Sequence, residues 1–73
     1  MDIRVGQVLE FLDPVIIEGR VIERGTRARV GHILTEVMEP KLTLVLLDVE
    51  NTPTIVVHHR VAGVHCRIVS EGS

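Results

Sequence analysis

The chain contains no tryptophan and no tyrosine, and Phe11 is its only aromatic residue. Domains that bind proline-rich peptides or methylated lysine build their grooves and cages from aromatic side chains. The composition therefore comes close to excluding both kinds of recognition. The same lack argues against single-stranded nucleic acid as a ligand, because proteins that bind it use aromatic side chains as stacking platforms.

Cysteine is almost absent, and long apolar runs are missing. Cys66 is the single cysteine, so the chain forms no intrachain disulfide and has no paired spacing of the kind that holds structural zinc. No run approaches the roughly 18 apolar residues of a spanning helix, and residues 1–4 do not begin a signal peptide. A free thiol is tolerated in a reducing compartment. We therefore expect a cytoplasmic protein with no membrane partner.

Lysine is also scarce, since Lys41 is the only lysine among eight basic residues. The others are arginines, which proteins prefer where a cation is partly buried or grips a carboxylate or phosphate with two hydrogen bonds. A bias in genomic base composition would explain the same excess. The formal net charge of −2 gives no bulk attraction to nucleic acid or to anionic lipid.

Aliphatic residues are abundant by contrast. Hydrophobic residues occupy 45% of only 73 positions, and nearly all of them are valine, isoleucine or leucine. We expect one domain over residues 1–73, with a flexible polar tail at 70–73 and a core that gives only marginal stability. Part of the apolar surface is expected to be buried against another copy of the chain or another protein. A self-sufficient monomer is the alternative.

Short apolar runs bounded by turn residues are typical of β-strands, and they organise the chain, most clearly between residues 41 and 69. Residues 27–39 fit a strand better than a helix, although a helix over this segment stays an open alternative. Because a few short strands would leave exposed edges, we expect an all-β fold, a small five- to six-stranded barrel. The predicted strands are 5–12, 15–24 with a kink at Gly19, 27–39, 42–49, 54–60 and 65–69, with a 3₁₀ turn at 61–64.

In their spacing of strands and glycines, several segments resemble the SH3-like small β-barrels. These segments are 6–11, 24–33, 44–48, 55–57 and 61–64. The closing half is also similar in spacing to the type II dihydrofolate reductases of plasmids and gene cassettes, small barrels that assemble as tetramers around one active site. That family lines its pore with Val-Gln-Ile-Tyr, whereas residues 56–59 here read Val-Val-His-His. The resemblance therefore implies a barrel that oligomerises, without the reductase activity.

Four arginines lie within ten residues around the predicted turn at Gly25 and Thr26. If this turn is a hairpin tip, their side chains would grip phosphates or an acidic partner. Glu18 and Glu23 lie among them and would neutralise part of the charge, so a solvated surface with ion pairs is the alternative. The four arginines are Arg20, Arg24, Arg27 and Arg29.

Histidines gather near the end of the chain, and His58, His59 and Arg60 form a candidate ligand-binding or interface segment. A zinc site is a further hypothesis, although adjacent residues of a strand point to opposite faces and cannot share a metal. The alternative is solvated histidines, with Cys66 packed as a small apolar residue. The candidate ligands are His32, His58, His65 and Cys66, but we expect no metal and no cofactor.

The sequence has no Gly-rich phosphate loop, no spaced pair of carboxylates and little room for a pocket. We therefore predict a non-catalytic interaction module that associates with itself or docks on a larger protein, such as an accessory protein of a phage, plasmid or gene cassette. A regulator that binds nucleic acid through the four arginines is the first alternative. The second is an oligomeric ligand-binding protein or enzyme, with a site shared between subunits and His58 and His59 at the symmetry axis.

Overall fold

The computed structural model describes residues 3–35, 38–51 and 53–71 of the chain. Within these ranges the chain forms seven strands and one short helix. They are β1 (Val8–Phe11), β2 (Val15–Ile17), β3 (Arg20–Ile22), β4 (Arg27–Leu34), β5 (Lys41–Leu46), β6 (Thr54–His58), α1 (His59–His65) and β7 (Cys66–Ser70).

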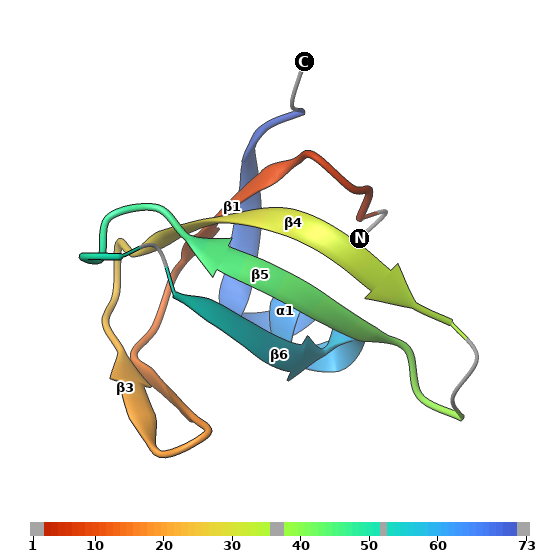
Figure 1. The fold of residues 1–73 in the computed structure, drawn as a ribbon, viewed down its shortest axis with the longest axis horizontal. Coiled ribbons are helices and arrows are strands. Elements are labelled where there is room, and N and C mark those ends of the chain that lie inside the picture. The colour runs from red at the N-terminus through yellow and green to blue at the C-terminus, as the bar shows by residue number, and fades with distance from the viewer. Residues whose placement is uncertain (1–2, 36–37, 52, 72–73) are drawn as a thin grey trace.

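Five of the strands form one antiparallel sheet in the order β6-β5-β4-β1-β7. The consecutive strands β4, β5 and β6 lie side by side, and α1 then carries the chain behind them to β7, which pairs with β1 (Figure 1). β2 and β3 pair only with each other and project from one end of the molecule as a hairpin (Figure 1). The main sheet ends on β6 at one side and on β7 at the other.

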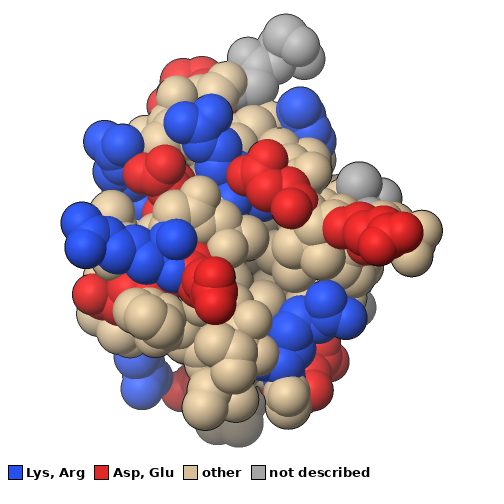
Figure 2. Space-filling view, turned by 90° about the vertical axis from the view of Figure 1, so that its left-hand side faces the viewer, with Lys and Arg blue, Asp and Glu red and all other residues tan. Residues whose placement is uncertain are grey.

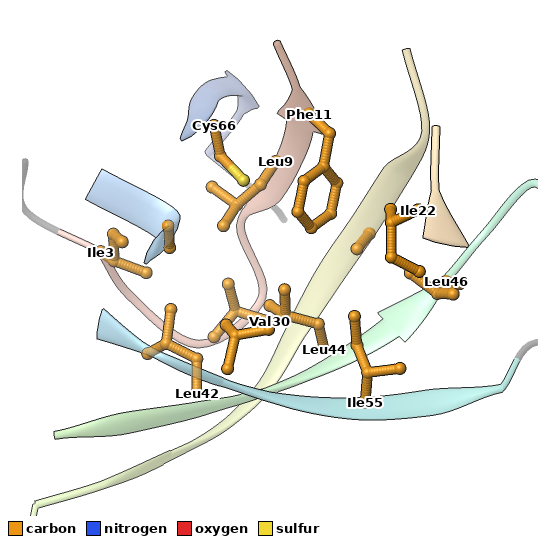
Figure 3. Packing of buried hydrophobic residues seen from close by; sticks show 13 residues of the cluster. Ile3, Leu9, Phe11, Ile22, Val30, Leu42, Leu44, Leu46, Ile55 and Cys66 are labelled. Atoms are coloured by element: carbon orange, nitrogen blue, oxygen red, sulfur yellow. The ribbon is translucent and has the colours of Figure 1, made fainter. Parts of the chain in front are cut away.

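Alternate residues of the strands build the core. Leu42, Leu44 and Leu46 of β5 are fully buried on one face, whereas the residues between them are only half-buried. In Figure 3 the side chains of Phe11 and Ile22 point from β1 and β3 into the same apolar interior. The hairpin and the main sheet therefore share one core, as the period of two in each strand requires.

The prediction of an all-β domain is confirmed, and α1 is the only helix in the described ranges. The chain forms seven strands where five or six were predicted, because residues 15–24 divide into β2 and β3. The barrel does not close, since β6 and β7 both remain edges of the sheet.

Residues 15–24 form a tight hairpin, so the prediction of one kinked strand is wrong. Ile17 pairs with Arg20, which leaves Glu18 and Gly19 as a two-residue turn. Their φ angles are 53° and 76°. Positive φ at both positions is the type I′ geometry, whose twist matches that of the flanking strands. Gly19 therefore reverses the chain and does not bend a continuing strand.

β4 is a strand, so the helix alternative for this part of residues 27–39 is wrong. Its side-chain alternation breaks at Gly31, where the register with β5 shifts between Val30 and His32. A bulge adds one residue to a strand and turns the following side chains to the other face. His32 and Leu34 are therefore exposed while Val30 is buried, although unbroken alternation along the strand would place all three on one face. Residues 36 and 37 of the predicted strand 27–39 lie outside the described residues.

The predicted strand 54–60 ends at His58, and the next residues turn into α1. This helix has seven residues and buries Ala62, so it is longer than the 3₁₀ turn expected at 61–64. No helix in the described part of the chain has the length and apolar character needed to cross a membrane.

Gln7 anchors both ends of the chain and is the one buried polar side chain among the described residues. Its Oε1 accepts a hydrogen bond from the Arg4 backbone N–H at 2.7 Å, and its Nε2 donates to Glu71 Oε1 at 2.8 Å. The predicted first strand 5–12 is accordingly shortened to β1. At the other end, β7 includes Ser70 of the predicted tail 70–73, and the Glu71 carboxylate accepts the hydrogen bond from Gln7.

Glu18 offers a test of the hairpin turn, because its φ of 53° is costly for a residue with a side chain. Asparagine adopts this conformation more readily and favours type I′ turns before glycine. We expect Glu18→Asn to raise the free energy of unfolding by about 0.5 kcal/mol, and the β-branched control Glu18→Val to lower it. Urea unfolding measures both, and a lower stability for Glu18→Asn would contradict the turn.

Candidate functional site

Glu10 of β1 lies between two arginines from the neighbouring strands. The register places it opposite Arg27 of β4 and Arg67 of β7. Glu10 Oε1 accepts a hydrogen bond from Arg67 Nε at 3.0 Å and lies 2.9 Å from Arg67 Nη2, while Oε2 lies 3.6 Å from Arg27 Nε. Two nitrogen atoms of one guanidinium thus contact the same carboxylate oxygen, a geometry that lysine does not offer. We call these three residues the Glu10 triad.

The triad keeps Glu10 ionised. The hydrogen bond from Arg67 lowers the pKa of Glu10 below its usual value of 4.5, although partial burial acts in the opposite direction. The positive charges of Arg67 and Arg27 lower it further. At neutral pH the carboxylate therefore offsets one of the two positive charges that the arginines would offer to a phosphate group.

The predicted arginines on β4 are already engaged with this chain. Arg27 belongs to the Glu10 triad, and Arg29 Nη1 donates a hydrogen bond to the carbonyl oxygen of Gly6 at 3.2 Å. Both therefore help to hold β4 against β1 and the loop before it. Each of the two guanidinium groups thus already has a partner within the chain.

The other two predicted arginines lie apart from each other. Arg24 lines an open depression together with Arg67, and Arg20 lines a different one together with Asp48. On the face shown in Figure 2, basic and acidic side chains alternate and form no continuous basic surface. The structure thus distributes the four arginines over several surroundings and does not gather them into one site.

His58 and Arg60 meet at Glu39, a residue of the β4–β5 connection that sequence reasoning did not single out. His58 Nδ1 lies 3.3 Å from Glu39 Oε2, and Arg60 Nη2 donates to Oε1 at 2.8 Å. The backbone N–H of His59 donates to the Pro40 carbonyl at 2.9 Å. These residues line a shallow recess where β6 passes into α1. Glu39 pairs with Arg60 and lies beside His58, so the described part of the recess offers no unpaired charged group for catalysis and is better suited to contact with another protein.

The candidate metal ligands do not converge. His32 is exposed on β4, His58 lies at the recess, and His65 Nδ1 lies 3.3 Å from Asp13 Oδ2. Among the described residues, no three or more His, Cys, Asp or Glu side chains are grouped so that they could hold a metal ion. Burial raises the pKa of the Cys66 thiol to about 12. Cys66 therefore stays protonated at neutral pH and packs in the core, where it is neither a ready nucleophile nor a ready ligand.

The hairpin carries an exposed aliphatic pair that sequence reasoning missed. Ile16 and Val21 lie opposite each other in β2 and β3, and they are 76% and 60% exposed. Val15 and Ile17 on the other face pack against the core. We call the outward pair the hairpin face. The alternation of side chains before and after Gly19 would indicate this exposed pair, but only if Gly19 is interpreted as part of a turn.

Cys66 gives a direct test of the buried thiol. The rise of its pKa from 9.0 to about 12 lowers the thiolate fraction at pH 8 by about 1,000-fold. We expect iodoacetamide to alkylate the folded chain slower than the urea-unfolded chain by about this factor, since the thiolate is the reacting species. Mass spectrometry of timed samples measures both rates. Equal rates would contradict a packed, protonated thiol.

The Glu10 triad predicts a pH-dependent stability. Because the pKa of Glu10 is lowered in the folded state, its stabilising contribution is present above about pH 4.5 and is lost as the pH falls through the lowered value. We expect Glu10→Gln to unfold at lower urea than the wild type at pH 7, with the gap closing at acid pH. Glu23→Gln serves as the control, since Glu23 is exposed and the described residues offer its carboxylate no ion pair. A gap that is the same at pH 7 and pH 3 would contradict the role of the triad.

Comparisons with known proteins identify no relative. A scan against models of protein families finds no match, and searches of curated proteins and of solved structures find none either. The function is therefore argued from the residues and surfaces described above.

Proposed function

We propose that this chain is a non-catalytic protein-interaction module built on an SH3-like barrel and working in the cytoplasm. The order of its elements supports the SH3-like assignment. β1 opens the fold, the hairpin of β2 and β3 follows, β4 to β6 form the meander, and a short helix precedes the final strand β7. The sheet order β6-β5-β4-β1-β7 agrees with this assignment, since the last strand pairs with the first.

The hairpin face is the observation that carries the proposed function. Ile16 is 76% exposed on an element that projects from the domain, while Ile22 on the opposite face of the same hairpin is 2% exposed. The aliphatic pair therefore adds nothing to the core and leaves apolar surface in contact with water. Apolar surface in such a position is typical of a protein–protein contact.

The surroundings of the hairpin face fit a protein partner. Glu18 and Arg20 at the turn are exposed and of opposite charge, so they give the aliphatic pair a polar rim. Interfaces commonly combine an apolar centre with a rim of this kind. The partner that this chemistry selects is a protein with an apolar patch.

The two alternatives have less support. Nucleic acid would need arginines gathered on one surface or stacking aromatics, but the four predicted arginines lie in separate surroundings, and Phe11 is only 1% exposed. Catalysis would need an activated group, but the one thiol of the chain stays protonated. A salt-dependent affinity for random-sequence DNA or RNA would reverse this ranking.

A photo-crosslinking residue at position 16 tests the proposed function. Ile16→benzoylphenylalanine places the reactive group on the hairpin face, and we expect irradiation of cells that express the chain to give adducts of higher mass that contain a second polypeptide. Denaturing gels and mass spectrometry identify the adducts. Their yield should fall at least about tenfold in a chain that also carries Val21→Asp, because a buried charge opposes the apolar contact.

Thr35 provides the matched control, since it is exposed and lies beyond the end of β4, away from the hairpin. The same photo-crosslinking residue at position 35 should give few adducts. Adducts of equal yield from both positions would show chance contacts only, and a complete absence of protein adducts from position 16 would contradict the proposed function.

A further inference from the structure

The main sheet has two edges, and they are protected to very different degrees. β7 carries the charged residue Arg67, and its pairing with β1 is interrupted by a register shift between Val8 and Leu9. Charges and bulges of this kind discourage a further strand from pairing with an edge. β6 reads Thr-Ile-Val-Val-His and has no lysine, arginine or carboxylate, no internal proline and no register shift with β5. β6 is therefore an edge open to strand addition.

The backbone of β6 presents a regular set of unpaired groups. The Leu46 N–H donates to the Pro53 carbonyl at 2.9 Å, and the His59 N–H donates to the Pro40 carbonyl at 2.9 Å. Both bonds point toward β5, so alternation along an antiparallel ladder directs the backbone groups of Ile55 and Val57 the same way. The N–H and C=O groups of Thr54, Val56 and His58 then point away from the sheet. In the described ranges β6 has no strand neighbour other than β5.

We propose that a second copy of this chain adds to the edge, β6 against β6 in antiparallel orientation, with Val56 opposite Val56 of the second copy. This inference rests on the proposed function and names one of its partners. In this register Thr54 faces His58 of the second copy, and His58 faces Thr54. The outward backbone N–H and C=O groups of Thr54, Val56 and His58 then bond to those of the second copy, which gives about six backbone hydrogen bonds between the two copies. The two five-stranded sheets become one continuous sheet.

The side chains of β6 suit this self-pairing. Thr54, Val56 and His58 share the outer face, and Val56 is 39% exposed. Two β-branched valines would meet at the symmetry axis, a favourable cross-strand pair. No residue of the strand would face a like charge. Ile55 and Val57 remain in the core of their own copy, so the pairing disturbs no buried contact.

Charge at the two ends of β6 selects the antiparallel orientation. Asp48 and Glu50 lie in the turn that precedes the strand, whereas Lys41 and Arg60 lie at its other end, where Glu39 offsets only one of the two cations. Antiparallel pairing brings the acidic end of one copy to the basic end of the other, and parallel pairing would bring like charges together. The hairpin comes near β6 but belongs to the other sheet, so it does not occupy the ladder.

The solution mass of the full chain at different concentrations tests the proposal. We expect sedimentation velocity between about 1 µM and about 1 mM to show the mass rising from 8.1 kDa toward twice that value, with a dissociation constant in the micromolar range for so small a contact. Val56→Pro removes the central outward N–H, which β5 does not use, and edge strands tolerate proline. It should weaken association at least tenfold, whereas Val56→Thr, which keeps the N–H, should not.

A charge exchange tests the orientation without touching the strand. Lys41→Glu and Glu50→Arg should each weaken association several-fold, and the chain with both changes should regain wild-type association, because opposite charges again meet between copies. These surface variants keep the proposal testable if Val56→Pro fails to fold. Equal weakening in the single and the double variants would overturn the antiparallel orientation.

Amide hydrogen exchange identifies the surface that associates. Above the dissociation constant, the N–H groups of Thr54, Val56 and His58 should gain protection at least tenfold, whereas those of Ile55 and Val57 are already protected by β5. Protection gained elsewhere, or a mass of 8.1 kDa at all concentrations, would overturn the proposal. Such a monomer would leave the proposed function intact if position 16 still forms protein adducts, so the two failures are distinguishable.

Discussion

The burial of one face of β5 is the constraint on which the rest of the structure depends. Leu42, Leu44 and Leu46 are fully buried, and β5 lies between β4 and β6 with all three strands antiparallel. A slip of one residue would move these leucines to the outer face, so their burial fixes the register of both neighbours. The same constraint decides which residues of β6 turn their backbone groups outward. A packing requirement in the core thus determines the chemistry that the edge of the sheet presents.

A chain of 73 residues cannot enclose all of its aliphatic side chains within one core. The structure places the surplus on outer faces, with Ile16 and Val21 on the hairpin and Val56 on the edge strand among the exposed ones. Three independent features meet in this arrangement: the apolar composition, the open sheet and the projecting hairpin. Under our proposal, contact with another polypeptide would cover the exposed aliphatic side chains and pair the open edge.

The sequence was sufficient to predict the class of the fold, because short apolar runs bounded by turn residues are a local property. It was insufficient where backbone geometry overrides side-chain pattern. A glycine within an apolar segment is compatible with a kinked strand and with a tight turn, so the sequence around Gly19 does not distinguish the two. The bulge at Gly31 reverses the alternation of buried and exposed side chains along β4. For the candidate site, the four arginines were visible as a cluster, but their separation was not. Only the pairing of β1 with β4 and β7 brings Glu10 to Arg27 and Arg67, which lie far apart along the chain.

The composition also limits how such a domain recognises a partner. Without exposed aromatic side chains it cannot build a stacking platform or a cage, and its guanidinium groups on β4 serve its own structure. What remains available is the least specialised recognition chemistry that a protein has, namely backbone hydrogen bonds along an edge and aliphatic contact on a hairpin. This chemistry needs no rare residue and no motif. Under our proposal, a chain rich in valine, isoleucine and leucine and poor in aromatic residues would bind in this way, and the opposite charges at the two ends of its edge strand would set the direction of binding.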